Sequence, residues 1–205
     1  MGAIRNHRQY RDAIGADAIG IGIAARLARE GAQVVLINLD TTEELITQSP
    51  TEPIFDGIKV VTSSLDQSLQ RPIECAIKEL GGLDILINNV LPLPDIAPVE
   101  QQTSEAFKAA FNRIECAAMA MQYALPALID SGHGRIINVG HRYGESVNRQ
   151  IGAYNTAAWS LRGLTRTAAV EWGCYQITTN LLLPAAQTPE FEACYQTRPH
   201  VLDLM

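Results

Sequence analysis

The residue best placed for chemistry is Tyr154, near the start of a predicted helix over about 151–172. The preceding run 134–140 is typical of a buried strand ending in a loop, and His141 follows it directly. This order predicts a helix that carries one tyrosine towards a pocket. A tyrosine with its ordinary pKa near ~10 is a poor base at pH 7 unless a nearby cation lowers that pKa.

Two side chains could assist Tyr154. Arg162 lies eight residues further along the same helical face, where it could reach the pocket; the usual exposure of arginine favours a helix-surface position instead. His141 could form a His–Tyr pair for a proton transfer without redox chemistry, or it could be an exposed loop histidine beside Arg142 and Tyr143. Arg142 and Arg149 are predicted to be solvated.

Other kinds of site find no support in the spacing of the residues. There is no G-x-S-x-G elbow, and Asp84 and Glu115 are not spaced as a carboxylate pair. No metal-ligand spacing with cysteines or carboxylates is present around the four histidines, which are His7, His133, His141 and His200.

Composition indicates one soluble domain of 205 residues, 1–205, with a sizeable core. The net charge of -6 disfavours nucleic acid or an anionic membrane surface as the main partner. No apolar run approaches the ~20 residues of a membrane helix, and we find no signal peptide. Scattered cysteines predict reduced core thiols of a cytoplasmic protein, and they are Cys75, Cys116, Cys174 and Cys194.

Strand and helix patterns alternate along the chain with short links, which predicts an α/β fold with a parallel sheet and right-handed crossovers. Strands are expected at 34–39, 58–62, 83–90, 136–139 and 177–183. A first helix is expected to end at Glu30, with Gly31 closing it. Further helices are expected at 69–80, 104–129 and 151–172, and Thr103 is expected to be the N-cap of the helix 104–129. A short helix is expected within 41–55 and another after Phe191. The polar segment 1–12 is predicted to be an exposed arm that cannot form a central strand.

Four ordered segments closely resemble the short-chain dehydrogenase/reductase family, over about 13–191. The strand 83–89 ending in Asn88-Asn89 resembles the strand before the family's NNAG motif. The strand 134–139 resembles the one before its catalytic serine, Tyr154 occupies the place of the YxxxK tyrosine, and Pro184 resembles the start of its PGxxxT turn. The resemblance implies a Rossmann-like, doubly wound parallel sheet. It also implies hydride transfer between NAD(P) and a carbonyl or alcohol.

The cofactor-binding positions of the family are altered here. Its TGxxxGxG glycines fall on Ile14, Ala18 and Gly20, or begin at Gly15 if the loop is one residue shorter. The strand before that loop is therefore expected to be degenerate. The ribose-binding acidic position falls on Asn38, with Asp40 two residues later as a ribose contact or a helix cap.

The Ala-Gly after the asparagines is replaced by Val90 and Leu91. Their side chains argue against the family's dinucleotide pose. Asn88 and Asn89 are then expected to be structural, although Asn88 stays a candidate cofactor contact.

Of the catalytic tetrad implied by the resemblance, only Tyr154 remains. The serine position is His141, the lysine position is Ala158, and the asparagine position is Arg113, with Asn112 next to it. Without the lysine, the resemblance no longer supplies the cation that lowers the tyrosine pKa and holds the nicotinamide ribose. This pattern predicts a catalytically degenerate member that binds no cofactor itself.

The resemblance further implies pairing through helices 104–129 and 151–172, whose small residues could pack against a partner or against the sheet. The chain is expected to be truncated at its C-terminus, which would leave a sheet edge uncovered. The first hypothesis is therefore a pseudoenzyme subunit in a hetero-oligomer, a dimer or tetramer, with an active paralogue that carries NAD(P). Paired subunits of 3-hydroxyacyl-CoA-type dehydrogenases, as in aromatic degradation, are one setting.

Three alternatives stay open. The chain could be an active NAD(P)-dependent oxidoreductase that uses Tyr154 with Arg162 or His141. It could be a cofactor-free lyase, isomerase or cyclase with His141 and Tyr154 as acid and base. It could also be a divergent product without a preserved role.

Overall fold

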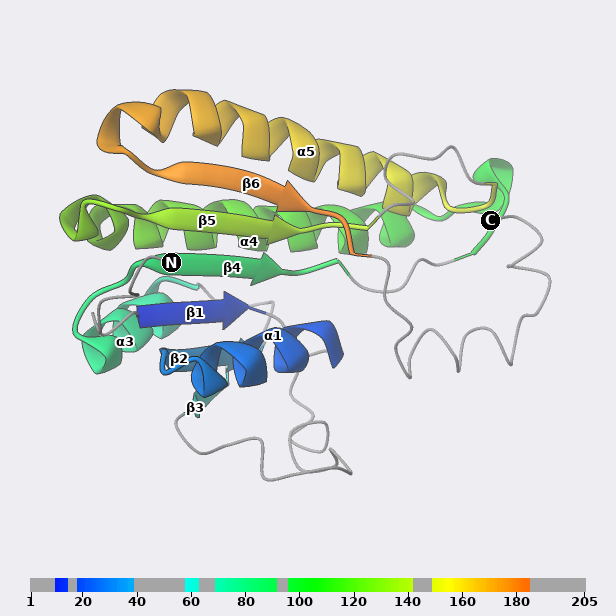
Figure 1. The fold of residues 1–205 in the computed structure, drawn as a ribbon. Coiled ribbons are helices and arrows are strands. Elements are labelled where there is room, and N and C mark those ends of the chain that lie inside the picture. Colours follow the sequence, from blue (N-terminus) through cyan, green and yellow to red (C-terminus); the bar gives the residue numbers. More distant parts are fainter. Residues whose placement is uncertain are drawn as a thin grey trace.

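The computed structural model describes residues 10–14, 18–38, 58–62, 69–91, 96–141 and 149–184, and the fold is that of a doubly wound α/β protein. One parallel sheet of six strands has the order β3-β2-β1-β4-β5-β6 (Figure 1). The strands are β1 (Tyr10–Ile14), β2 (Gln33–Asn38), β3 (Ile58–Thr62), β4 (Ile85–Asn89), β5 (Arg135–Val139) and β6 (Thr178–Leu182). The strand order reverses between β1 and β4, which is where ligands bind in open sheets of this kind.

The first strand corrects the interpretation of segment 1–12 as an arm that cannot be a central strand. Residues 10–12 belong to β1, which lies in the middle of the sheet. Arg11 pairs in register with Val34 of β2 and with Ile85 of β4. The prediction was wrong because it judged the strand by side-chain polarity, whereas a strand between two parallel neighbours is held by backbone hydrogen bonds that any residue except proline can make.

The helices follow the predicted pattern closely. They are α1 (Ala18–Arg29), α3 (Gln70–Leu80), α4 (Ser104–Ser131) and α5 (Gly152–Trp172), and two 3₁₀ turns cover Val99–Gln101 and Gly173–Tyr175. Thr103 caps α4 as predicted, because its hydroxyl accepts a hydrogen bond of 3.1 Å from the Ala106 amide. Gly31 follows α1 with φ of 85°, a conformation that favours glycine. The elements expected within 41–55 and after Phe191 lie outside the described residues.

Alternation along β2 divides the core between the two faces of the sheet. Val35 and Ile37 belong to the large buried cluster formed with α3, α4 and α5. Val34 and Leu36 belong to a smaller cluster on the other face, with Ala24 of α1. In Figure 1, α1 lies in front of the sheet and α4 behind it. Because successive side chains of a strand point to opposite faces, a continuous apolar run is buried on both sides.

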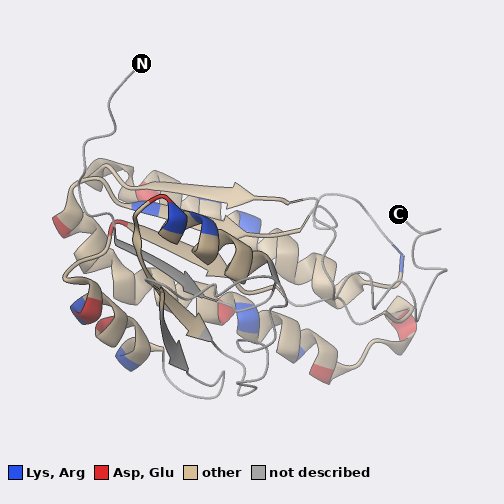
Figure 2. Cartoon of the chain, turned by 60° about the horizontal axis from the view of Figure 1, so that its bottom comes forward, with Lys and Arg blue, Asp and Glu red and all other residues tan. Residues whose placement is uncertain are grey.

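The small residues of α4 and α5 are mostly buried within the chain. Ala117, Ala120, Ala124 and Ala157 are completely buried. The interpretation as packing within the chain is therefore confirmed for these positions. The same two helices leave large apolar side chains exposed, namely Phe111, Trp159 and Val170. Figure 2 shows acidic and basic residues interspersed on the described helices, as in the exposed ion pair between Arg26 and Glu30.

Candidate functional site

Tyr154 lies in the first turn of α5 and is only 5% exposed. It forms a separate apolar cluster with Ile151 and Ala158, against which Leu91 and Ile96 pack. Two segments distant in sequence therefore meet at the tyrosine, namely the chain that leaves β4 and the start of α5. The predicted helix therefore carries Tyr154 in its first turn, and the surroundings of the tyrosine are mainly apolar; that it points into a pocket stays a prediction.

His141 follows β5 directly and lies beside Tyr154. The centroids of the two rings are 6.3 Å apart and the rings are inclined by 74°, an edge-to-face arrangement. His141 is half-buried, so the interpretation as a merely exposed loop histidine is wrong. The ring contact with Tyr154 accounts for the partial burial of the imidazole.

Ala158 occupies the lysine position four residues after Tyr154 and is 6% exposed. The spacing places both residues on one helical face, and both belong to the cluster with Ile151, Leu91 and Ile96. Apart from the tyrosine hydroxyl, the side chains of this cluster contain no polar group that could bind a ribose hydroxyl. The residue at the lysine position therefore supplies no donor for a ribose hydroxyl.

The two arginines singled out from the sequence have other surroundings. The Arg162 guanidinium lies 5.3 Å from the ring centroid of Trp159, which is a cation–π contact. The Trp159 side chain is 52% exposed. The helix-surface interpretation of Arg162 is thereby supported. On α4, Arg113 lies near Cys116, where its charge opposes the larger effect of burial, which raises the pKa of the thiol. Asn112 is exposed.

Asn88 takes part in a buried polar network between strands and helices. Its Nδ2 donates a hydrogen bond of 2.8 Å to Asn138 Oδ1, and Asn138 Nδ2 donates one of 2.9 Å to Thr165 Oγ1. The Thr165 hydroxyl in turn donates to the Leu161 carbonyl at 2.7 Å. Asn88 and Asn138 are completely buried, so the network joins β4 and β5 to α5 through the core.

Sequence reasoning missed Asn138 and Thr165. The available signal was the asparagines within two apolar strands, of which Asn88 of β4 and Asn138 of β5 are direct partners in the register. A polar side chain in a buried strand requires a hydrogen-bonding partner, so two such residues on adjacent strands can be expected to meet.

The remaining cofactor candidates are only partly described. Gly20 is buried within α1, and Asn38 ends β2, whereas Gly15 and Asp40 lie outside the described residues. Val90 is 2% exposed and belongs to the main core. Of Val90 and Leu91, only Leu91 contacts the Tyr154 cluster.

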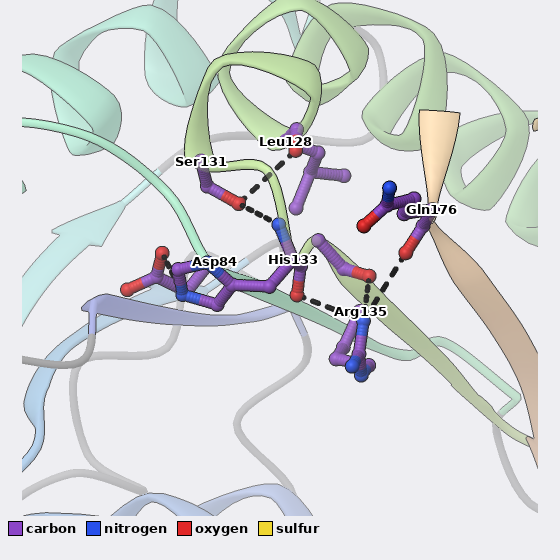
Figure 3. A network of polar contacts seen from close by, with 7 residues as sticks. Asp84, Leu128, Ser131, His133, Arg135 and Gln176 are labelled. Carbon is purple, nitrogen blue, oxygen red and sulfur yellow. Dashed lines mark hydrogen bonds and ion pairs between the residues drawn. The ribbon is translucent and has the colours of Figure 1, made fainter. Parts of the chain in front are cut away.

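A second polar cluster lies at the amino ends of β4, β5 and β6 (Figure 3). His133 Nε2 lies 3.1 Å from Asp84 Oδ1. Arg135 donates to the carbonyl oxygens of His133 and Gln176, at 2.9 and 3.3 Å. These contacts tie together the loops that precede β4, β5 and β6, which is a structural role.

Three further findings concern the described residues alone. None of their helices is both long and apolar enough to span a membrane. They contain no group of three or more potential metal ligands. Cys75 and Cys174 are exposed and only Cys116 is buried, so the prediction of core thiols is wrong for two of them. Cys75 lies on an outward-facing position of the amphipathic helix α3, and Cys174 lies in the turn after α5.

Comparison with known proteins agrees with this geometry. A family model described as enoyl-(acyl carrier protein) reductase matches residues 13–201. A 12alpha-hydroxysteroid dehydrogenase from a Clostridium species is 30% identical over 86% of this chain and 71% of its own. The short chain dehydrogenase/reductase astE of Aspergillus oryzae is 30% identical, over 81% of this chain and 66% of its own. This chain thus spans about two thirds of the length of these relatives.

Solved structures show the same fold. The carveol dehydrogenase of Mycobacterium avium, in complex with NAD, has a TM-score of 0.83 at 22% identity and covers 98% of this chain and 79% of its own. The sheet order, the Tyr154 helix and the matched range lead to one assignment. The chain belongs to the short-chain dehydrogenase/reductase family.

Proposed function

We propose that this chain is a non-catalytic subunit that pairs with an active paralogue of the same family, in which NAD(P)-dependent oxidation of an alcohol or reduction of a ketone takes place. The observation that carries the proposal is the burial of Ala158 in an apolar cluster at the lysine position. The substrate of the partner, the 3-hydroxyacyl-CoA class included, and its place in aromatic degradation remain predictions.

The pKa of a catalytic tyrosine decides how well it transfers protons. A tyrosine with its ordinary pKa near ~10 carries little phenolate at pH 7, and acid–base catalysis is most efficient when the pKa lies near the working pH. In this family a lysine four residues after the tyrosine is the cation that lowers that pKa. Ala158 has no amino group, so this position supplies no such cation to Tyr154. The contact between Arg162 and Trp159 does not support Arg162 as a replacement.

The outer faces of α4 and α5 are the proposed partner surface. Phe111, Trp159 and Val170 are 41%, 52% and 83% exposed. Exposed large apolar side chains on neighbouring helices are typical of protein–protein contacts. Most alanines of these helices are buried inside the protomer, so the partner would meet the larger side chains.

The proposal is tested by native mass spectrometry of the tagged protein purified from its own cells. The expected result is a stoichiometric complex with a family member that has an intact YxxxK motif, and nicotinamide cofactor on that member alone. Val170→Asp should abolish the complex, because a carboxylate would be placed in an apolar interface. Val99→Asp is the matched control, since Val99 is also an exposed valine, at 70%, but lies outside both helices. A homo-oligomer with bound NAD(P) would refute the proposal.

A second candidate rests on the contact between His141 and Tyr154. A histidine beside a tyrosine could exchange protons in a cofactor-free lyase or isomerase. In that case the purified protein would be a homo-oligomer without cofactor. Its activity on a substrate would have a pH profile with a limb near a histidine pKa, and His141→Ala would abolish that activity.

A further inference from the structure

Helix α5 begins without a cap of its own. Ile151 occupies the N-cap position and makes no side-chain hydrogen bond to the helix. The first amides of a helix have no partner within it and usually find one in a serine, threonine, asparagine or aspartate at this position. Tyr154 lies in this first turn, so whatever holds the turn also sets the position of the tyrosine.

The missing partner comes from a residue 51 positions earlier in the sequence. Gln102 Oε1 accepts a hydrogen bond of 2.6 Å from the Ala153 amide. Gln102 Nε2 donates to the carbonyl oxygens of Ala97 and Gln150, at 3.0 and 3.2 Å. Both polar atoms of the Gln102 amide are thus hydrogen-bonded. The oxygen binds the start of α5, and the nitrogen binds the two segments that meet just before it.

These bonds close the segment 96–102 over the tyrosine. The Ala97 amide donates to the Gln150 carbonyl at 2.8 Å, and Ala97 pairs with Ile151 in an isolated parallel bridge. Ile96, adjacent to this bridge, packs against the Tyr154 cluster. A Cβ on Gly152 would lie 3.1 Å from Gln102 Oε1, so the helix start approaches the glutamine closely.

We propose that Gln102 is the positioning residue of the Tyr154 site. Its carbonyl oxygen caps α5 and its amide nitrogen holds the segment 96–102 closed, which keeps Tyr154 buried and fixed. This inference goes beyond the proposed function, because it concerns how the site is held and applies whether or not the chain is catalytic.

Two substitutions separate the two halves of the contact. Gln102→Glu keeps the acceptor for the Ala153 amide and removes the donor to Ala97 and Gln150. Gln102→Leu removes both. Gln101→Leu is the matched control, because Gln101 is the adjacent glutamine and its side chain is exposed. The readouts are nitration of Tyr154 by tetranitromethane, relative to the 45% exposed Tyr175, and hydrogen exchange of the Ala97 and Ala153 amides.

We expect Gln102→Leu to speed Tyr154 nitration roughly tenfold, as for the loss of one or two hydrogen bonds, and to speed exchange at both amides. In Gln102→Glu, Tyr154 nitration should rise while the Ala153 amide stays protected. Exchange at Val35 and Ile37 of β2 should not change, which distinguishes local opening from global unfolding.

Three outcomes would overturn the proposal. The first is unchanged Tyr154 nitration in Gln102→Leu, and the second is a rise that the β2 amides share in equal proportion. The third is a Gln102→Glu protein that matches the unsubstituted protein in every readout. If Gln102→Leu does not fold, Gln102→Glu alone decides the matter.

Discussion

Replacement of Asn138 by alanine should be among the most destabilising single changes in the described core. Asn138 is completely buried between β4 and α5. It accepts a hydrogen bond from Asn88 at 2.8 Å and donates one to Thr165 at 2.9 Å. Alanine removes both bonds and leaves the Asn88 amide nitrogen with only a contact of 3.5 Å to the Ala117 carbonyl.

The magnitude follows from these contacts. Two net hydrogen bonds contribute about 2 kcal/mol, and a buried donor without a good partner costs about 1–3 kcal/mol more. The truncated side chain also leaves a small cavity. We therefore expect the free energy of unfolding to fall by about 3–5 kcal/mol, a large part of the about 5–15 kcal/mol typical of a domain.

Urea unfolding followed by circular dichroism measures this change, with Asn180→Ala as the matched control. Asn180 lies on the neighbouring strand β6 and is exposed, so its replacement should change the unfolding free energy by no more than about 0.5 kcal/mol. Thr165→Val removes the acceptor used by Asn138. The double variant should be less destabilised than the sum of the two single variants, by about 1 kcal/mol, because both remove the same bond.

A loss below about 1 kcal/mol for Asn138→Ala would refute the reasoning. It would mean that the neighbouring amides find other partners at little cost. Strict additivity with Thr165→Val would show that the bond between Asn138 and Thr165 contributes nothing.

Three further outcomes are expected. Thr103→Ala should lower the unfolding free energy by about 1 kcal/mol in urea, because the Ala106 amide loses its cap; no change would contradict the role of this bond. Cys116 should react with iodoacetamide more slowly than exposed Cys174 at pH 8, since burial hides the thiol and raises its pKa, so that less thiolate is present; equal rates by mass spectrometry would contradict this. Ala158→Lys should destabilise the fold by about 1–3 kcal/mol through overpacking. It should not produce NAD(H) binding in calorimetry, because the rest of the apolar cluster remains. Micromolar binding would count against this cluster as the obstacle to cofactor binding.

The sequence by itself determined most of the elements and the family. The alternation of apolar strands with amphipathic helices depends on local periodicity, so the strands from β2 onward and the described helices appear within a few residues of their predicted positions. Thr103 was found for the same reason, because a cap is set by its own residue and the next turn. The order of the motifs, from Asn88-Asn89 to Tyr154, was enough to indicate the family and to show that the lysine position is Ala158.

Tertiary structure decided what depends on contacts between distant segments. The polar strand β1 is central because two neighbours pair with its backbone, which side-chain polarity does not reveal. His141 lies against Tyr154. Arg162 lies against Trp159, although its spacing on the helix allowed either a pocket position or a surface position. Gln102 and Asn138 act across 51 and 27 residues, on Ala153 and Thr165. A hydrogen bond of this kind is specified by the folded backbone, because neither partner carries a local sign of the other.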